Sequence, residues 1–225
     1  MYKLGLVGKD ISHSRSKSIY EEILKKEVKY SLLDYKSENE IPRLDELFSG
    51  GLTGLSITAP YKSHFINQVN IENKLIRNLE IINCIKKVDN RYFATNTDYL
   101  AIEEIVTKYL EEMSSVVILG DGKMAQVCSI ILNKKAVPYR QYSRSVDGPI
   151  GALSLKNENH KTLIINTCSR DFIFKGELDA SSLFWDLNYS HAAHKKTLCN
   201  ICRYEDGLLL LKMQGEFAVK YWGIS

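Results

Sequence analysis

The stretch that decides the fold of the second half of this chain is Ser115-Val116-Val117-Ile118-Leu119-Gly120-Asp121-Gly122-Lys123-Met124-Ala125. The apolar run before the first glycine predicts a buried strand, and the residues that follow, to about Lys134, predict a helix. The turn between them has the form G-x-G-x-x-A. In that fingerprint the first glycine allows a tight turn, the second lets the backbone approach a pyrophosphate, and the alanine lets the helix pack closely. The stretch predicts a Rossmann-like dinucleotide-binding unit, although a tight strand-to-helix turn without a ligand can have the same form.

The next strand, Pro138 to Tyr142, ends in Ser143-Arg144-Ser145. In Rossmann-like folds the end of this strand meets the adenosine ribose. An acidic residue there binds a free 2′-hydroxyl, and an arginine suits a 2′-phosphate. Arg144 is the first charged residue at this position, which favours NADP over NAD. The alternative interpretation of Arg144 is an ordinary surface cation.

The strands and helices on either side of this stretch alternate, which is typical of α/β proteins with parallel sheets. After Arg144 we expect strands over Thr162 to Ile165, Leu183 to Leu187 and Leu198 to Cys202, then a last helix from about Leu208 to Trp222. In the first half the expected strands are Tyr2 to Val7, Tyr30 to Tyr35, Leu52 to Ile57, Ile81 to Lys86 and Tyr92 to Ala94. The expected helices there are Lys17 to Lys26, capped by a nearby serine, then Ile41 to Phe48, and Tyr99 to Glu112 with Asp98 as its N-cap.

Lys62 ends the segment Gly54-Leu55-Ser56-Ile57-Thr58-Ala59-Pro60-Tyr61-Lys62. Pro60 cannot donate to a sheet ladder, so the strand is expected to stop before it. Thr58 and Lys62 then follow a strand end, which is where open α/β folds place their chemistry. A lone lysine is more often a solvated surface charge, and the case for Lys62 depends on residues elsewhere in the chain.

Composition limits the class of protein. The chain has 225 residues, of which 44% are hydrophobic, and a net charge of +3 with acids and bases interspersed. These values predict a folded protein that binds neither nucleic acid nor membrane. The apolar segment Met1 to Gly8 is too short for a signal peptide, and the 5 scattered cysteines fit free thiols in a reducing compartment, so we expect a cytoplasmic protein. Cys199 and Cys202 have CxxC spacing without a second pair, so no metal site is predicted.

Several stretches together resemble the shikimate dehydrogenase family, and the resemblance covers nearly the whole chain. The family's paired-serine motif stands here as His13-Ser14-Arg15-Ser16, and its Asn-Val-Thr-x-Pro-x-Lys motif as Ser56 to Lys62. Its Asn-Thr-Asp motif is present at Asn96, Thr97 and Asp98. The matching segments that remain occur in the family's order: Asn83, the glycine turn, Ser143 to Ser145, Ile165 to Thr167, Asp186 to Tyr189, and Asp206-Gly207 through Gln214-Gly215.

The resemblance implies an α/β fold of two domains. An N-terminal substrate domain with a mostly parallel sheet would comprise residues 1–100 plus 206–225, with the C-terminal helix returning to it. A Rossmann-like NADP-binding domain would comprise residues 101–205. It also implies site residues: Lys62 and Asp98 as the catalytic pair; Ser14, Ser16, Thr58, Asn83, Tyr189 and Gln214 around the substrate; and Gly120, Gly122, Lys123, Met124, Ala125, Ser143, Arg144, Ser145, Leu187 and Gly207 around the cofactor.

The implied activity is NADP-dependent shikimate dehydrogenase, an enzyme of aromatic amino-acid biosynthesis that interconverts 3-dehydroshikimate and shikimate. The implied partner is therefore a small molecule, and the protein would be a monomer or homodimer. Lys62 would exchange a proton with the reacting oxygen or stabilise charge on it, and Asp98 would hold Lys62 in place. The alternatives are a quinate/shikimate-type dehydrogenase with relaxed cofactor use, and a non-catalytic binder of shikimate-like molecules.

Overall fold

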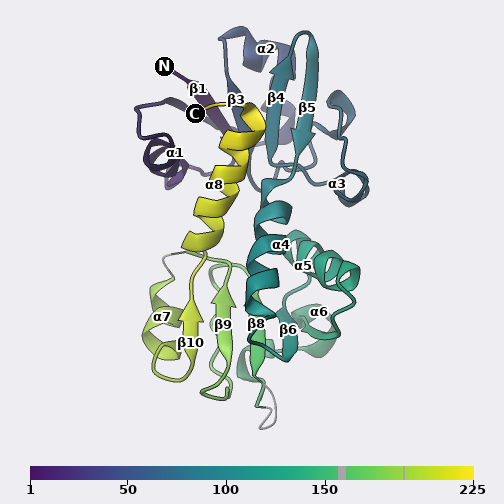
Figure 1. The fold of residues 1–225 in the computed structure, drawn as a ribbon, viewed down its shortest axis with the longest axis vertical. Coiled ribbons are helices and arrows are strands. Elements are labelled where there is room, and N and C mark those ends of the chain that lie inside the picture. The colour runs from purple at the N-terminus through teal and green to yellow at the C-terminus, as the bar shows by residue number, and fades with distance from the viewer. Residues whose placement is uncertain (157–160, 190) are drawn as a thin grey trace. The chain divides into compact units, whose positions relative to one another are not determined.

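The computed structural model describes residues 1–156, 161–189 and 191–225, and it divides into two compact units. The first unit comprises Met1–Ala101 with Leu211–Ser225, and the second comprises Ile102–Leu210. Each unit contains one five-stranded sheet and helices that follow its strands. Figure 1 follows the chain from β1 to α8 through both sheets. The predicted α/β class is confirmed.

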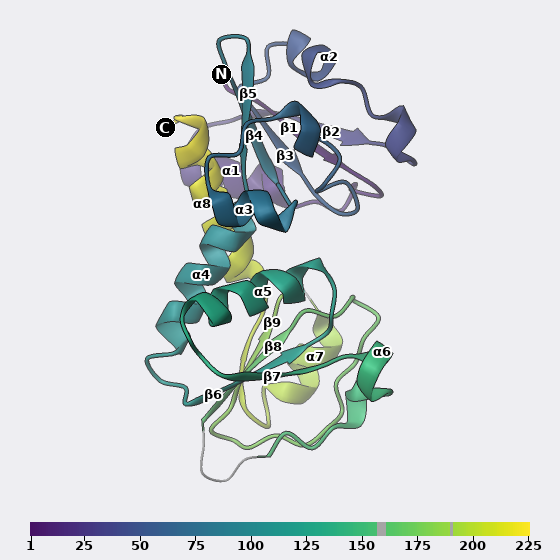
Figure 2. The ribbon, with the colours of Figure 1, turned by 90° about the vertical axis from the view of Figure 1, so that its right-hand side faces the viewer.

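The sheet of the first unit has the strand order β2-β1-β3-β4-β5, which Figure 2 shows as a fan of strands. Strand β1 pairs in parallel with β2 and β3, whereas β4 is antiparallel to both β3 and β5. It follows that β4 alone opposes the common direction of this sheet. The bounds are β1 (Lys3–Gly8), β2 (Lys29–Asp34), β3 (Gly54–Ile57), β4 (Cys84–Val88) and β5 (Arg91–Thr95).

The helices of the first unit are α1 (Ser16–Leu24), α2 (Leu44–Ser49) and α3 (Lys74–Leu79), with short 3₁₀ turns at Glu38–Glu40 and Ile66–Gln68. The start of α4 (Thr97–Tyr109) and most of α8 (Leu208–Trp222) also belong to it. Trp222 of α8 is buried against β3 and donates its indole N–H to the Ile85 carbonyl at 3.0 Å. Gly54 is required there, because a Cβ atom at Gly54 would lie 2.3 Å from the Trp222 ring.

The sheet of the second unit has the order β10-β9-β8-β6-β7, and every pairing in it is parallel. The carboxyl ends of its strands therefore lie along one edge. The strands are β6 (Ser115–Leu119), β7 (Tyr139–Tyr142), β8 (Thr162–Asn166), β9 (Leu183–Asp186) and β10 (Arg203–Glu205). The helices are α5 (Lys123–Lys134), α6 (Arg144–Asp147) and α7 (Ala192–Leu198), with a 3₁₀ turn at Ile150–Ala152.

Three local predictions were wrong. Residues Leu198 to Cys202 are not a strand: Leu198 ends α7, and the Cys202 amide bonds to the Leu198 carbonyl at 3.0 Å. Leu198 and Cys202 are both buried because they are four residues apart on a continuing helical turn, not because buried and exposed residues alternate as in a strand. Helix α1 has Arg15 rather than a serine at its N-cap position, and the Ser14 hydroxyl, one residue earlier, accepts from the Ser16 amide at 3.3 Å. Helix α4 is capped by Asn96 rather than Asp98, as described below.

No helix among the described residues is long and apolar enough to cross a membrane.

Candidate active site

Lys62 and Asp98 meet in the first unit although 36 residues separate them in sequence. The Lys62 Nζ atom lies 2.6 Å from Asp98 Oδ2, and both side chains are largely enclosed, at 19% and 13% exposed. The turn that carries Lys62 is fixed on both sides, because the Ile82 amide donates to the Lys62 carbonyl and the buried Tyr61 hydroxyl donates to the Tyr35 carbonyl. This pair combines a proton donor with a carboxylate that orients it.

Asp98 is available to Lys62 because another residue caps its helix. The Asn96 side-chain oxygen accepts from the Tyr99 amide at 2.9 Å, and the Asn96 carbonyl accepts the first helical bond from Leu100. These are the contacts of an N-cap residue. Asp98 thus lies in the first turn of α4, where the helix dipole favours negative charge. The alternative interpretation of Asp98 as a simple cap is therefore wrong.

Asn83 and Gln214 are joined through Thr97. The Asn83 side-chain oxygen accepts from the Thr97 amide at 2.7 Å, and the Thr97 hydroxyl lies 3.1 Å from that oxygen and 3.2 Å from Gln214 Oε1. One hydroxyl has a single proton, so it serves one of these acceptors at a time. Gln214 also donates its amide to the Leu211 carbonyl at 3.0 Å. The network fixes two predicted substrate residues beside Asp98.

Ser14 and Ser16 lie close together where the loop after β1 enters α1. Their hydroxyl oxygens are 3.2 Å apart, and both side chains are half-buried. Thr58, the fifth predicted substrate residue of this unit, is half-buried just beyond β3, where its amide continues the ladder to Val7. Neutral hydroxyls can donate to a carboxylate without burying a positive charge.

A second group of hydroxyls lies near the paired serines. The Tyr20 and Ser56 hydroxyls are 2.9 Å apart and buried. The Tyr30 hydroxyl is buried without a hydrogen-bond partner among the described residues. Burial raises the pKa of Tyr20 and of Tyr30 well above the ordinary tyrosine value, while Ser16 and Ser56 lie near enough to lower that of Tyr30. Both phenols therefore remain neutral donors.

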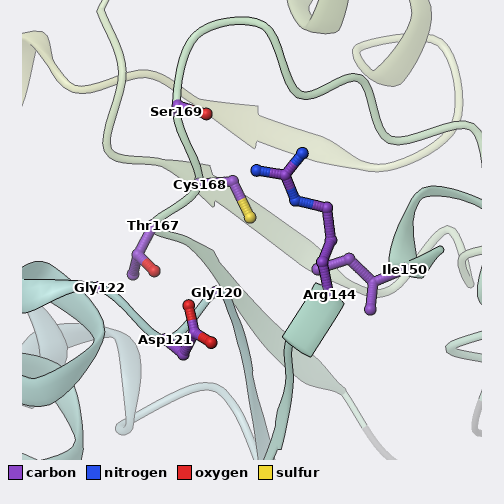
Figure 3. Close-up of a pocket in the computed structure, with 8 residues that line it drawn as sticks. All are labelled: Gly120, Asp121, Gly122, Arg144, Ile150, Thr167, Cys168 and Ser169. Carbon is purple, nitrogen blue, oxygen red and sulfur yellow. The ribbon is translucent and has the colours of Figure 1, made fainter. Parts of the chain in front are cut away.

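The glycine turn of the second unit forms one wall of a cavity of about 180 Å³, shown in Figure 3. Gly120 has a φ of +109°, and a Cβ atom there would lie 2.5 Å from the Thr167 hydroxyl, so only glycine fits. Gly122 is the N-cap of α5, has open space where a Cβ would be, and brings no side-chain cap bond. The buried Ala125 allows α5 to pack on the sheet, while Lys123 is exposed and Met124 half-buried.

The segment after β7 forms another wall. Ser143 is buried, its amide donates to Asp147 at 2.8 Å, and its hydroxyl lies 2.8 Å from that of Ser145. Arg144 begins α6 and lines the cavity with the Thr167-Cys168-Ser169 segment after β8. Burial raises the pKa of Cys168 to about 11, so its thiol stays protonated at neutral pH. The cavity thus combines a cation with open backbone groups, which suits a phosphorylated nucleotide.

Leu187 and Gly207 approach each other very closely. A Cβ atom at Gly207 would lie 2.2 Å from the Leu187 carbonyl oxygen, and the Gly207 amide donates to the Asn188 carbonyl. Tyr189 follows in the same segment, where its carbonyl accepts from Arg170 and its ring lies under the Arg170 guanidinium, 5.0 Å from the ring centre. Tyr189 belongs to the second unit, whereas the other predicted substrate residues belong to the first.

The buried carboxylate of Asp186 anchors this segment. Its Oδ1 accepts from the side chain of Asn166 and from both the amide and side chain of Asn188, each at 3.0 Å. Its Oδ2 accepts from His194 Nδ1 at 2.7 Å. Burial by itself raises the pKa of Asp186, but the bonds from His194 and Asn188 outweigh it and hold the pKa below its ordinary value. The ends of β8 and β9 are thereby tied together.

Asp186, His191 and His194 are close enough to one another to suggest a cation site. The ring nitrogens have other partners, however. His194 Nε2 accepts from the Phe174 amide at 2.8 Å while its Nδ1 faces Asp186, and His191 bonds to the Arg170 carbonyl and the His194 amide. We therefore interpret these histidines as structural.

Sequence reasoning missed several residues of both sites. Thr97 is not among the predicted site residues, although its position between Asn96 and Asp98 is a signal that could have found it. The Thr167-Cys168-Ser169 wall could have been expected from its place at a strand's carboxyl end. Asp186 lies in a segment that matches the family but is not among the predicted site residues, and no feature of the sequence points to His194.

Comparison with known proteins agrees with the geometry. Residues 6–85 match the family model described as shikimate dehydrogenase substrate binding domain. The chain is 27% identical to a protein named shikimate dehydrogenase (NADP(+)) from Actinobacillus pleuropneumoniae, with 99% of this chain and 92% of that protein covered. A similarly named protein from Clostridium perfringens is 28% identical over 56% of this chain. That match spans about half, 48%, of the length of the Clostridium perfringens protein.

Solved structures share the fold. Shikimate dehydrogenase from Aquifex aeolicus superposes with a TM-score of 0.76 at 19% identity, covering 99% of this chain and 92% of that one. Shikimate 5-dehydrogenase from Thermus thermophilus, in complex with NADP(H) and shikimate, gives 0.72 at 18% identity, covering 99% and 93%. The predicted two-domain fold and the resemblance on which it rested are confirmed.

Proposed function

Since residues 6–85 match the substrate-binding domain of shikimate dehydrogenases, we propose that this protein is an NADP-dependent shikimate dehydrogenase. It transfers a hydride reversibly between NADPH and 3-dehydroshikimate, giving shikimate. The substrate is a small molecule with one carboxylate and several hydroxyls, and the protein acts as a monomer or homodimer. The single observation that carries the proposal is the enclosed contact of 2.6 Å between Lys62 and Asp98.

The reaction needs a group that exchanges a proton with the reacting oxygen. In the reducing direction, Lys62 donates a proton to the carbonyl oxygen as negative charge develops there, and it takes the proton back in the oxidising direction. Asp98 keeps the amine in position by accepting its hydrogen bond at 2.6 Å. A fixed donor costs little reorganisation at the moment of reaction, which is why the enclosure of the pair matters.

Recognition of the rest of the substrate uses neutral groups. Ser14 and Ser16 donate to the substrate carboxylate from the start of α1. Thr58, Asn83 and Gln214 bind ring hydroxyls, with Asn83 and Gln214 kept in place by Thr97. Tyr189 is assigned to the substrate as well. A site made of hydroxyls and amides rejects analogues that lack a matching hydroxyl, because its polar groups would then be unpaired.

The residues of the second unit fit NADP. The Gly122 backbone is open to a pyrophosphate, and Gly122 at the N-cap has no side chain to cap the first turn of α5, so the helix N-terminus can receive an anion. Arg144, with Ser143 and Ser145, is assigned to the 2′-phosphate, and Leu187 with Gly207 to the nicotinamide side. When bound, the nicotinamide ring supplies or accepts the hydride.

The test is an absorbance assay of the purified protein with shikimate and NADP⁺, repeated with NAD⁺ and with quinate. We expect formation of NADPH with shikimate, and a higher kcat/KM for shikimate than for quinate. Equal rates with quinate would favour the quinate/shikimate alternative. Shikimate binding by calorimetry without turnover under any condition would contradict the proposal and favour the non-catalytic binder.

A further inference from the structure

Asp121 introduces a negative charge into the glycine turn. It occupies the middle position of Gly120-Asp121-Gly122, and its carboxylate accepts a hydrogen bond from the Ser145 hydroxyl. Ser145 in turn lies 2.8 Å from the Ser143 hydroxyl. Figure 3 shows Asp121 and Arg144 lining the same cavity from different elements, the turn after β6 and the start of α6. An anion and a cation therefore face the ligand together.

A second carboxylate adds to this arrangement. Asp171 accepts from the Ser169 hydroxyl, and Ser169 lines the cavity. The Ser145 bond is the main cause that lowers the pKa of Asp121, the Ser169 bond does the same for Asp171, and the charge of Arg144 contributes in both cases. Both acids are thus ionised at neutral pH. The field of Arg144 is already opposed by two negative charges before any phosphate enters.

A 2′-phosphate and a free 2′-hydroxyl respond to these groups in opposite ways. The phosphate carries close to two negative charges, so Arg144 attracts it and Asp121 repels it. It must also compete with Asp121 for the Ser145 hydroxyl. A 2′-hydroxyl can donate to the Asp121 carboxylate, as an acidic residue does in NAD-binding folds.

We propose that Asp121 is a specificity-determining residue that weakens the preference for NADP over NAD set by Arg144. The inference rests on the proposed function, because it assigns this cavity to the adenosine ribose of the cofactor. The consequence is that the protein accepts NAD with an affinity closer to that for NADP than a cavity with Arg144 and no acid would allow. The charge, rather than the shape, of residue 121 sets this balance.

The experiment compares the wild type with Asp121→Asn by calorimetric titration of NADP⁺, NAD⁺, 2′,5′-ADP and 5′-AMP. Asparagine keeps the size of the side chain and can still accept from Ser145, so the turn is retained. We expect affinity for NADP⁺ and 2′,5′-ADP to rise about tenfold, while that for NAD⁺ and 5′-AMP stays the same or falls. The gain should shrink as salt is raised from about 0.05 to about 0.5 M, because exposed charges are screened.

Glu104→Gln is the matched control, since it removes one exposed carboxylate from the same unit but does not line the cavity. It should leave the ratio of the two affinities unchanged. An unchanged ratio in Asp121→Asn, or weaker NADP⁺ binding, would overturn the role of Asp121 alone. Absence of binding by either dinucleotide to the wild type would instead overturn the cofactor assignment in the proposed function, and the inference with it.

Discussion

The candidate site of the first unit is assembled from segments far apart in sequence, whereas that of the second begins with one contiguous turn. Lys62 and Asp98 are 36 residues apart, and Thr97 and Gln214 are 117 apart. In the second unit, Gly120 to Ala125 follow one strand and open one helix. The first arrangement depends on tertiary packing, and the second is set largely by local backbone geometry.

The two sites also differ in the solvent exposure and pairing of their charged side chains. Lys62 and Asp98 are enclosed and matched to each other, and the groups around them are neutral amides and hydroxyls. Arg144 and Asp121 are exposed and line an open cavity. Since water screens exposed charges, substitutions in the second cavity should change affinity by modest factors, while those in the first should change catalysis strongly.

Lys62→Ala is the substitution for which we expect the largest effect on catalysis. We expect kcat to fall about 10³-fold with a much smaller change in KM for shikimate, because removal of a positioned proton donor acts mainly on the transition state. The measurement is the steady-state rate of NADPH formation. Lys74→Ala, an exposed lysine of the same unit, should keep the wild-type rate. A Lys62→Ala enzyme with wild-type kcat would remove Lys62 from the chemistry.

Asp186→Asn tests whether the second unit also depends on a buried charge. Both carboxylate oxygens of Asp186 accept hydrogen bonds, but the side-chain amide of an asparagine has only one oxygen. Its NH₂ group must therefore face either the Asn166 and Asn188 donors or the His194 Nδ1 donor, so that two donors oppose each other. His194 cannot readily exchange tautomers, because its Nε2 already accepts from the Phe174 amide. We expect a loss of about 3 kcal/mol in the free energy of unfolding, measured by urea denaturation. Asp206→Asn, which keeps an acceptor for the Leu208 amide, should cost far less.

The same variant should change the dependence of stability on pH. The pKa of Asp186 is lower in the folded protein than its ordinary value near 3.9. The ionised Asp186 side chain therefore contributes to the free energy of unfolding above about pH 4. This contribution is lost as the pH falls through the lower pKa that Asp186 has in the folded protein. Urea midpoints between about pH 3 and about pH 7 should fall less steeply in Asp186→Asn than in the wild type. Identical slopes of urea midpoint against pH in the two proteins would show that a group other than Asp186 causes the loss of stability at acid pH.

How much of each site could be predicted follows from this contrast. The glycine turn predicts the fold of the second unit, because the strand, the turn and the helix are adjacent in sequence. Each glycine of the turn is also explained by the local backbone geometry. Lys62 and Asp98 were paired only through the family resemblance, since periodicity says nothing about contacts 36 residues apart. The sequence alone also allows Asp98 as the helix cap, and only the structure shows that Asn96 has that role. The Asp186–His194 contact could not be predicted, because a buried polar pair depends on packing that no local pattern encodes.

Gly54→Ala sharpens the comparison by changing packing without touching a polar group. The added methyl carbon would lie 2.3 Å from the Trp222 ring, so Trp222 must move and lengthen its bond to the Ile85 carbonyl. We expect a loss of about 2 kcal/mol in the free energy of unfolding, typical of overpacking. Because Gln214 and Trp222 share α8, KM for shikimate should also rise, while affinity for NADP⁺ stays the same. Gly50→Ala, where a Cβ meets nothing within 4 Å, is the matched control and should change neither quantity. An unchanged KM in a destabilised Gly54→Ala protein would mean that Gln214 keeps its place without the Trp222 contact, so that the first site depends less on distant packing than its assembly from separate segments suggests.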